Sequence, residues 1–245
     1  MSRKSQDDSP RVAAIEQPFP LPTIRSQRAR DVAAYFEIED RGETAGTCPV
    51  NRAALLQLLP PAGRATLITG ASGSGKSSLL REIRGMRPVD LVIDLAGIPL
   101  PDVPIVDLFP QLTLRQTLQM LSQVGLTEAW TYLRIPSELS DGQRWRLRLV
   151  LGIEAIKTQD DLLICDEFAA LLDRVTARIV AHRFAKLIAG KNVRAIIATS
   201  HDDLDLALRP AVKARCDFNI VEIEANHGQR LSSLPTQGTI NRKES

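Results

Sequence analysis

The sequence predicts an α/β fold in which a mostly parallel sheet is flanked by helices. Short continuous apolar runs alternate along the chain with segments of helical period, a pattern typical of βαβ units. The chain has 245 residues, of which 44% are hydrophobic, so it can build a substantial core. No stretch approaches the ~20 apolar residues of a membrane-spanning helix.

Composition excludes several classes of protein. Cys48, Cys165 and Cys216 lie far apart without CxxC spacing, which argues against a disulfide framework or a zinc site. The first residues lack the apolar run of a secretory signal. The net charge of +2 neither favours nor excludes nucleic acid as a partner. A soluble, cytoplasmic protein is therefore expected.

Five short apolar segments are the predicted strands. Three are continuous, as expected where helices cover both faces of a sheet: Ala65–Thr69, Leu162–Cys165 and Arg194–Thr199. Two shorter candidates are residues 91–94 and 104–106.

A long helix is predicted over residues 175–189, between the last two continuous strands. One face carries its large apolar side chains: Ile179, Val180, Phe184, Leu187 and Ile188. Gly190 follows and is expected to end the helix as the glycine just beyond its last turn.

A glycine-rich loop joins the first continuous strand to a helix that begins near Gly75. Residues 70–77 read GASGSGKS and match the phosphate-binding pattern GxxxxGK[ST], where glycines let backbone N–H groups close around phosphate oxygens. Lys76 would act in catalysis on the β- and γ-phosphates of ATP, and Ser77 would ligate Mg²⁺. The predicted nucleotide-binding residues here are Gly70, Ser72, Gly73, Ser74, Gly75, Lys76, Ser77 and Ser78. The alternative, a strand–helix turn without a ligand, is disfavoured by this context.

Two carboxylates, Asp166 and Glu167, directly follow the strand Leu162–Cys165. At the carboxyl end of a buried parallel strand they would face the crevice where ligands bind. Asp166 would then hold Mg²⁺, and Glu167 would be the general base toward the attacking water. A strand that merely ends at the surface is the alternative for this pair taken alone.

Three further motifs carry a family resemblance. Residues 139–143 (LSDGQ) resemble the LSGGQ signature of ATP-binding-cassette (ABC) ATPases. Residues 170–173 (ALLD) are similar to the D-loop of that family, and 199–201 (TSH) to its switch histidine. With the phosphate loop and the acidic strand end, the order matches, and residues 35–222 are identified as a member of the ABC ATPases with a P-loop NTPase core.

The resemblance implies a composite site in a head-to-tail dimer that sandwiches two ATP molecules. Ser140, Gly142 and Gln143 of one copy would contact the γ-phosphate bound by the other. His201 would be a further catalytic residue, and Asp173 would couple the two sites.

The chain departs from the transporter members of the family. Asp107 stands where they have the glutamine of the Q-loop and is a further candidate Mg²⁺ ligand. The distance in sequence from Lys76 to Ser140 is short, which predicts a short helical subdomain and makes a membrane partner less expected. Residues 166–170, Leu172–Asp173, Thr176–Ala177 and 208–210 resemble a soluble ABC-type group with some members fused to an acetyltransferase domain.

Some residues keep two interpretations. Tyr35 or Phe36 would stack on adenine, or the run 32–38 is a core strand. Arg144, Arg146 and Arg148 form a solvated or dimer-facing surface, or contact phosphates of a nucleic acid. His182 has no partner pattern and is expected to be structural or exposed.

Together these patterns predict a flexible arm over 1–30, an ABC-type ATPase domain over 31–231 and a flexible tail over 232–245. The expected function is hydrolysis of Mg·ATP by a soluble homodimer that drives an unidentified protein partner or a nucleic-acid process. The alternatives are the ATP-binding subunit of a membrane transporter and an ATP-gated dimerisation module with negligible turnover.

Overall fold

A computed structural model describes residues 13–16, 26–36, 52–217 and 220–225. Its seven strands form one sheet in the order β1-β7-β6-β2-β5-β4-β3. Five neighbouring strands run parallel to one another: β6, β2, β5, β4 and β3. At one edge, β7 pairs antiparallel with β6, and β1 pairs antiparallel with β7. The strands are β1 Ala13–Glu16, β2 Ala65–Thr69, β3 Val92–Asp94, β4 Leu162–Cys165, β5 Arg194–Thr199, β6 Val212–Asp217 and β7 Ile220–Ala225. The predicted mostly parallel sheet is confirmed.

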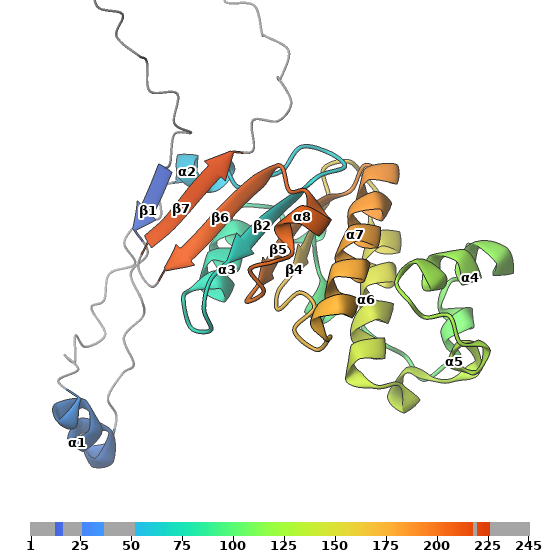
Figure 1. The fold of residues 1–245 in the computed structure, drawn as a ribbon, viewed down its shortest axis with the longest axis horizontal. Helices are drawn as coiled ribbons and strands as arrows, with labels where there is room; N and C mark the ends of the chain where they lie inside the picture. Colours follow the sequence, from blue (N-terminus) through green and yellow to red (C-terminus); the bar gives the residue numbers. More distant parts are fainter. Residues whose placement is uncertain (1–12, 17–25, 37–51, 218–219, 226–245) are drawn as a thin grey trace, which may run out of the picture.

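Helices cover both faces of this sheet. In Figure 1, α3 lies on one face, α6 and α7 lie on the other, and α4 and α5 form a small lobe beyond them. The helices within the described ranges are α1 Gln27–Tyr35, α2 Arg52–Leu56, α3 Lys76–Gly85, α4 Leu114–Gln123, α5 Ala129–Leu133, α6 Asp141–Ala155, α7 Arg174–Gly190 and α8 Asp205–Leu208. Short 3₁₀ turns occupy Val89–Leu91, Leu95–Gly97, Ile105–Leu108 and Pro136–Glu138. The predicted short helical subdomain corresponds to α4 and α5.

The continuous apolar strands are explained by two cores, one on each face. In β4, Leu163 and Cys165 pack into the core beneath α6 and α7, while Leu162 and Ile164 pack into the core beneath α3. All four side chains are almost fully buried. Because side chains of a strand alternate between faces, every side chain of a strand that is covered on both faces enters a core and is apolar.

The long helix α7 differs from its prediction in two details. Val180, Phe184 and Ile188 are buried as expected, but Ile179 is 53% exposed. Gly190 is still helical, and the left-handed residue that follows the helix is Asn192, with φ of 56°.

Three other predictions need correction. Ala13–Glu16, inside the expected arm, form an edge strand that pairs with β7. Residues 104–106 are not a strand, because Ile105–Leu108 form a 3₁₀ turn after Pro104. Tyr35 and Phe36 lie at the end of helix α1 rather than in a core strand, and are 82% and 66% exposed. The predicted tail 232–245 and Cys48 lie outside the described residues.

In the part of the chain that the structure describes, no helix is both long enough and apolar enough to cross a membrane.

Candidate active site

The phosphate loop begins where β2 ends and closes at the first residue of α3. Gly70, Gly73 and Gly75 all have positive φ, at 151°, 78° and 98°. A Cβ on Gly70 would lie 2.3 Å from the carbonyl oxygen of Cys216, so that position accepts glycine alone. At Gly73 a Cβ would meet no other atom, so only its positive φ favours glycine there.

The buried polar groups of the loop are Lys76 and Ser74, and Lys76 fits a bound phosphate. The Lys76 side chain is largely buried, and its ammonium donates to the carbonyl oxygens of Gly70 and Ala71, each at 2.7 Å. Ser74 Oγ is buried and has no hydrogen-bond partner among the described residues. A buried cation without a carboxylate partner is satisfied by an anionic ligand rich in oxygen. The Ser74 hydroxyl instead lies against Gly70, where an ideal Cβ would be 2.6 Å from it.

The acidic strand end is shaped by an anchored phenylalanine. Phe168 is fully buried, with its ring centroid 5.0 Å from that of Trp145 and 5.4 Å from that of Phe184. Its backbone N–H donates to the carbonyl of Ala198 at 2.8 Å. Just before it, Glu167 adopts the left-handed conformation, with φ of 49°. This turn leaves the Glu167 side chain exposed while its neighbour enters the core.

His201 is tied to the same turn. The buried Thr199 hydroxyl donates to the carbonyl of Phe168 at 2.9 Å and accepts from the His201 backbone N–H at 3.1 Å. The His201 imidazole Nε2 lies 3.3 Å from the carbonyl oxygen of Ala169. The end of β5 therefore fixes the loop that bears the Glu167 carboxylate.

These elements enclose one cleft of about 370 Å³. Its lining contains eight of the predicted site residues: Ser72, Gly73, Gly75, Lys76, Ser77, Ser78, Asp166 and Glu167. The cleft thus places a lysine ammonium, a serine hydroxyl and two carboxylates around one space. The Ser77 hydroxyl and Asp166 carboxylate are hard oxygen ligands of the kind that Mg²⁺ prefers.

The signature residues lie outside this cleft, at the start of α6. Ser140 caps the helix by accepting from the Gln143 N–H at 3.2 Å, and the Gln143 side chain accepts from the Ser140 N–H at 3.0 Å. Ser140 is exposed. A Cβ on Gly142 would meet Leu172 Cδ2 at 3.1 Å, so this glycine lets the helix approach the D-loop closely.

The remaining predicted residues are also absent from the cleft lining. Asp173 is exposed and caps α7 by accepting from the Thr176 N–H at 3.0 Å; these hydrogen bonds hold the pKa of Asp173 below its ordinary value. Asp107 is exposed in the 3₁₀ turn Ile105–Leu108. In Figure 1, α1, which carries Tyr35, stands away from the sheet.

Comparisons with known proteins place this geometry in context. No protein-family model matches the chain. It is 26% identical over 204 residues to the lipoprotein-releasing system ATP-binding protein LolD of Novosphingobium aromaticivorans, covering 68% of this chain and 88% of LolD. It is 30% identical over 172 residues to the aliphatic sulfonates import ATP-binding protein SsuB 2 of Agrobacterium fabrum, covering 60% of this chain. Only 63% of the SsuB 2 protein is spanned.

Solved structures share the fold. CbiO1 of Clostridium perfringens, part of the ABC transporter complex cbiONQ, superposes with a TM-score of 0.50 at 16% identity, covering 67% of this chain and 78% of that one. The chain is thus similar in sequence to ATP-binding proteins of these two systems, and its fold is that of the ABC ATPases. The ABC ATPase fold explains why the phosphate loop and the acidic strand end converge, since β2, β5 and β4 are neighbours in the sheet.

Sequence reasoning missed three features of this candidate site. Ala170 and Ser200 line the cleft; both lie inside the D-loop and switch motifs, but their small side chains did not mark them as site residues. Phe168 sets the direction of Glu167, yet an apolar residue after two acids gives no hint of its burial. Its partners Trp145 and Phe184 are distant in sequence, so only the fold brings them together.

The arginines that follow the signature are all engaged. Arg144 pairs with Asp141 and donates to the carbonyl of Leu139 at 2.8 Å. Arg146 donates to the carbonyls of Gly142 and Gly125, and its burial lowers the pKa of the guanidinium. Arg148 donates to the carbonyl of Ile98 at 3.4 Å. These contacts support a structural role rather than the alternative of phosphate contacts.

Proposed function

We propose that this ABC-type ATPase hydrolyses Mg·ATP in a head-to-tail homodimer and delivers the closing and opening of that dimer to a partner. The observation that supports hydrolysis is the cleft itself, where Lys76, Ser77, Asp166 and Glu167 line one space. A phosphate loop alone would explain binding. The carboxylate pair opposite the loop supplies the group that hydrolysis needs.

Each residue has a distinct task in this proposal. The ammonium of Lys76 exchanges its two carbonyl partners for phosphate oxygens and stabilises the charge that develops on the γ-phosphate. Ser77 and Asp166 would hold Mg²⁺, which supplies charge neutralisation on the phosphates. Glu167 takes the proton of the attacking water, and His201 holds the loop in place from β5.

The proposed dimer would bring the signature residues, which are absent from the cleft of their own chain, to the cleft of a second copy. The signature helix presents its exposed N-terminus at Ser140, away from its own cleft, so its dipole is available to a phosphate bound by a second copy. Leu171, in the D-loop, and Val175, just after it, are 58% and 69% exposed. Apolar side chains of this size next to a catalytic element favour cover by a second copy.

A complementation experiment tests the composite site. Lys76→Ala removes the phosphate-binding charge, and Ser140→Arg blocks the signature helix; each variant alone is expected to be inactive. In a mixed dimer, one site combines the intact phosphate loop of the Ser140 variant with the intact signature of the Lys76 variant. Mixing equal amounts should therefore restore about a quarter of wild-type turnover in a symmetric two-site dimer. Two inactive variants that stay inactive after exchange of subunits would contradict the composite site.

A second candidate is a transporter subunit, and one observation favours it. Leu114, Trp130 and Leu133, on α4 and α5, are 63%, 76% and 65% exposed. Such side chains on a small lobe are typical of a protein interface. The relatives named above are ATP-binding proteins of import and lipoprotein-releasing systems. Copurification with an integral membrane protein that is lost in Trp130→Ser would support this candidate over a partner outside the membrane.

The narrower resemblance, to the ABC-type group that is sometimes fused to an acetyltransferase, stays a prediction within this proposal. It favours a partner outside the membrane.

A further inference from the structure

The outer side of α7 has a basic surface away from the ATP cleft. Two hollows flank the helix and share His182 and Lys186. The larger, of about 520 Å³, lies between the end of α4 and α7, and the smaller, of about 200 Å³, reaches the first residue of β2, Ala65. Because β2 begins there and ends at the phosphate loop, these hollows lie at the opposite edge of the sheet from the cleft.

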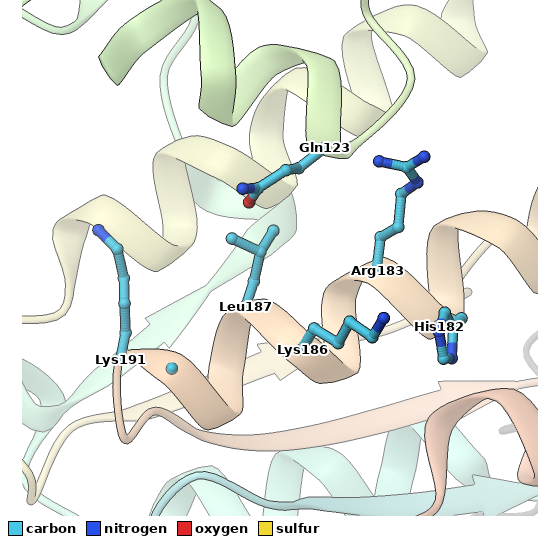
Figure 2. A pocket seen from close by; sticks show the side chains of 7 residues that line it. Gln123, His182, Arg183, Lys186, Leu187 and Lys191 are labelled. Atoms are coloured by element: carbon cyan, nitrogen blue, oxygen red, sulfur yellow. The ribbon is translucent and has the colours of Figure 1, made fainter.

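The lining of both hollows is rich in cations and contains no carboxylate. Figure 2 shows Arg183 and Lys191 rising from α7 at either side of Leu187, with Lys186 and His182 nearby. The smaller hollow adds Arg64 and Arg209. We call these six side chains the α7 basic surface: Arg64, His182, Arg183, Lys186, Lys191 and Arg209.

Most of this charge is not compensated within the described residues. Lys191 pairs with Glu154. Arg183 and Lys186 are exposed and have no ion pair or hydrogen bond to any described residue. Helix α7 itself contains no acidic residue between Arg174 and Gly190. Because the whole chain carries a net charge of only +2, the positive charge is concentrated on this helix.

The spacing along α7 favours an extended anion over a single small one. Arg174, Arg178, His182 and Lys186 recur at every fourth position, so they share a face with one basic side chain about every 6 Å. Arg178 is exposed. The guanidinium of Arg174 has a long ion pair, 3.9 Å, with the carboxylate of the exposed Asp202. This stripe leads directly into the two hollows.

We propose that the α7 basic surface binds the phosphate backbone of a nucleic-acid duplex without reading its sequence. Clustered uncompensated cations supply affinity through phosphate contacts and counterion release. The linings of both hollows contain no Phe, Tyr or Trp, so they lack the large aromatic rings on which bases of single strands stack. Two hollows along one ridge also match an extended polymer better than a flat membrane.

The side chain of Gln123 offers a way to distinguish RNA from DNA as the source of this backbone. Gln123 reaches from the end of α4 toward Leu187 in Figure 2, and its Oε1 is buried with no partner in the described ranges. An amide oxygen accepts from a hydroxyl and not from a phosphate oxygen. RNA carries a 2′-hydroxyl that could donate to this oxygen once the Gln123 side chain turns into the hollow, whereas DNA has no such hydroxyl.

This inference deepens the proposed function, on which it rests for the consequence of binding. Helix α7 begins at Arg174, directly after the D-loop residue Asp173 that caps it, and the α7 basic surface lies near its other end. A duplex held there would be the partner to which dimer closure is delivered. Binding itself does not require turnover, so the two claims are separable by experiment.

The test measures binding of fluorescein-labelled 25-base-pair duplexes of random sequence, as DNA and as RNA, by anisotropy across a range of salt concentrations. The full-length wild type is compared with Arg183→Gln/Lys186→Gln and with a matched control, Arg115→Gln/Arg134→Gln, which removes two exposed charges from the small lobe. Loss of two phosphate contacts should weaken binding about 60-fold at 0.1 M salt and reduce the slope of log K against log salt by about two. The control should bind like the wild type.

Several results would overturn the inference. They are an absence of duplex binding by the wild type, an equal loss in the control, or binding through Arg183 and Lys186 to vesicles of 30% phosphatidylserine but not to duplexes. Tighter binding of RNA that Gln123→Leu abolishes would assign the source as RNA. Lys76→Ala should keep duplex binding, so a wild type that binds duplex without hydrolysing ATP would refute the proposed function alone.

Discussion

Asp161 offers a quantitative test of how β4, and hence the proposed catalytic carboxylates, are positioned. Its side chain is only 5% exposed and lies immediately before the strand. It accepts from the Lys157 N–H at 2.6 Å, from the Thr158 N–H at 3.0 Å and from the Thr158 hydroxyl at 2.7 Å. Burial alone would raise the pKa of Asp161, but these hydrogen bonds outweigh it and hold the pKa below its ordinary value.

Asp161→Asn removes the charge from three buried hydrogen bonds. It also replaces one carboxylate oxygen with an NH₂ group, which is a donor and would face the N–H or O–H donors that this oxygen accepts from. Hydrogen bonds to charged groups and unsatisfied buried donors together predict a loss of about 3 kcal/mol in the free energy of unfolding. For a domain of this size, that loss lowers Tm by about 6 to 12 °C. The neighbouring Asp160→Asn, at an exposed side chain, is the matched control and should change Tm by less than about 1 °C.

The pH dependence follows from the direction of the pKa shift. A carboxyl whose folded pKa is depressed contributes its stability above the unfolded pKa, near ~3.9, and loses it as the pH falls through the folded pKa. Thermal unfolding should therefore show a constant difference between wild type and variant from about pH 8 to 5, and a shrinking one below about pH 4. A difference that is absent at pH 7, or that is unchanged as the pH approaches 3, would refute this reasoning.

Three further predictions concern the loop, the signature and the thiols. Gly70→Ala forces a Cβ against the Cys216 carbonyl and should cost about 2 kcal/mol or more and abolish ATP binding in calorimetry; normal ATP affinity would contradict the loop geometry. Ser140→Ala removes the N-cap of α6 and should cost about 1 kcal/mol in stability as well as turnover. Ser140→Asp should restore the cap but not turnover, and recovery of both would remove Ser140 from the site. Burial raises the pKa of the Cys165 thiol and raises that of Cys216 to about 11. Both should resist iodoacetamide at pH 8 until guanidinium unfolds the chain, and rapid labelling of Cys165 or Cys216 in the native protein, located by peptide mass spectrometry, would contradict their burial.

Much of the fold could be predicted because the signals are local. Leu162–Cys165 and Arg194–Thr199 are strands because helices cover both of their faces, which leaves a continuous apolar run in the sequence. The phosphate loop is likewise local, since Gly70 and Gly75 are required by backbone conformation within a few residues of Lys76.

The failures occurred where distant contacts decide. Ala13–Glu16 became a strand only because β7, some 200 residues later in the chain, offers a free edge. Ile179 was assigned to the apolar face, but the buried positions Ala177, Val180, Ala181 and Phe184 define a stripe that leaves it outside. The left-handed turn at Glu167 depends on Phe168 entering a core built from α6 and α7.

Steady-state hydrolysis of Mg·ATP by the wild type and by Glu167→Gln tests the central claim most directly. The substitution keeps the size of the side chain and removes only its capacity to take a proton. We predict that the wild type turns over, and that the variant binds ATP with unchanged affinity while its turnover falls by about 100- to 10,000-fold. A wild type without turnover, or a variant that hydrolyses ATP at the wild-type rate, would contradict the assignment of this cleft as a hydrolytic site with Glu167 as its base.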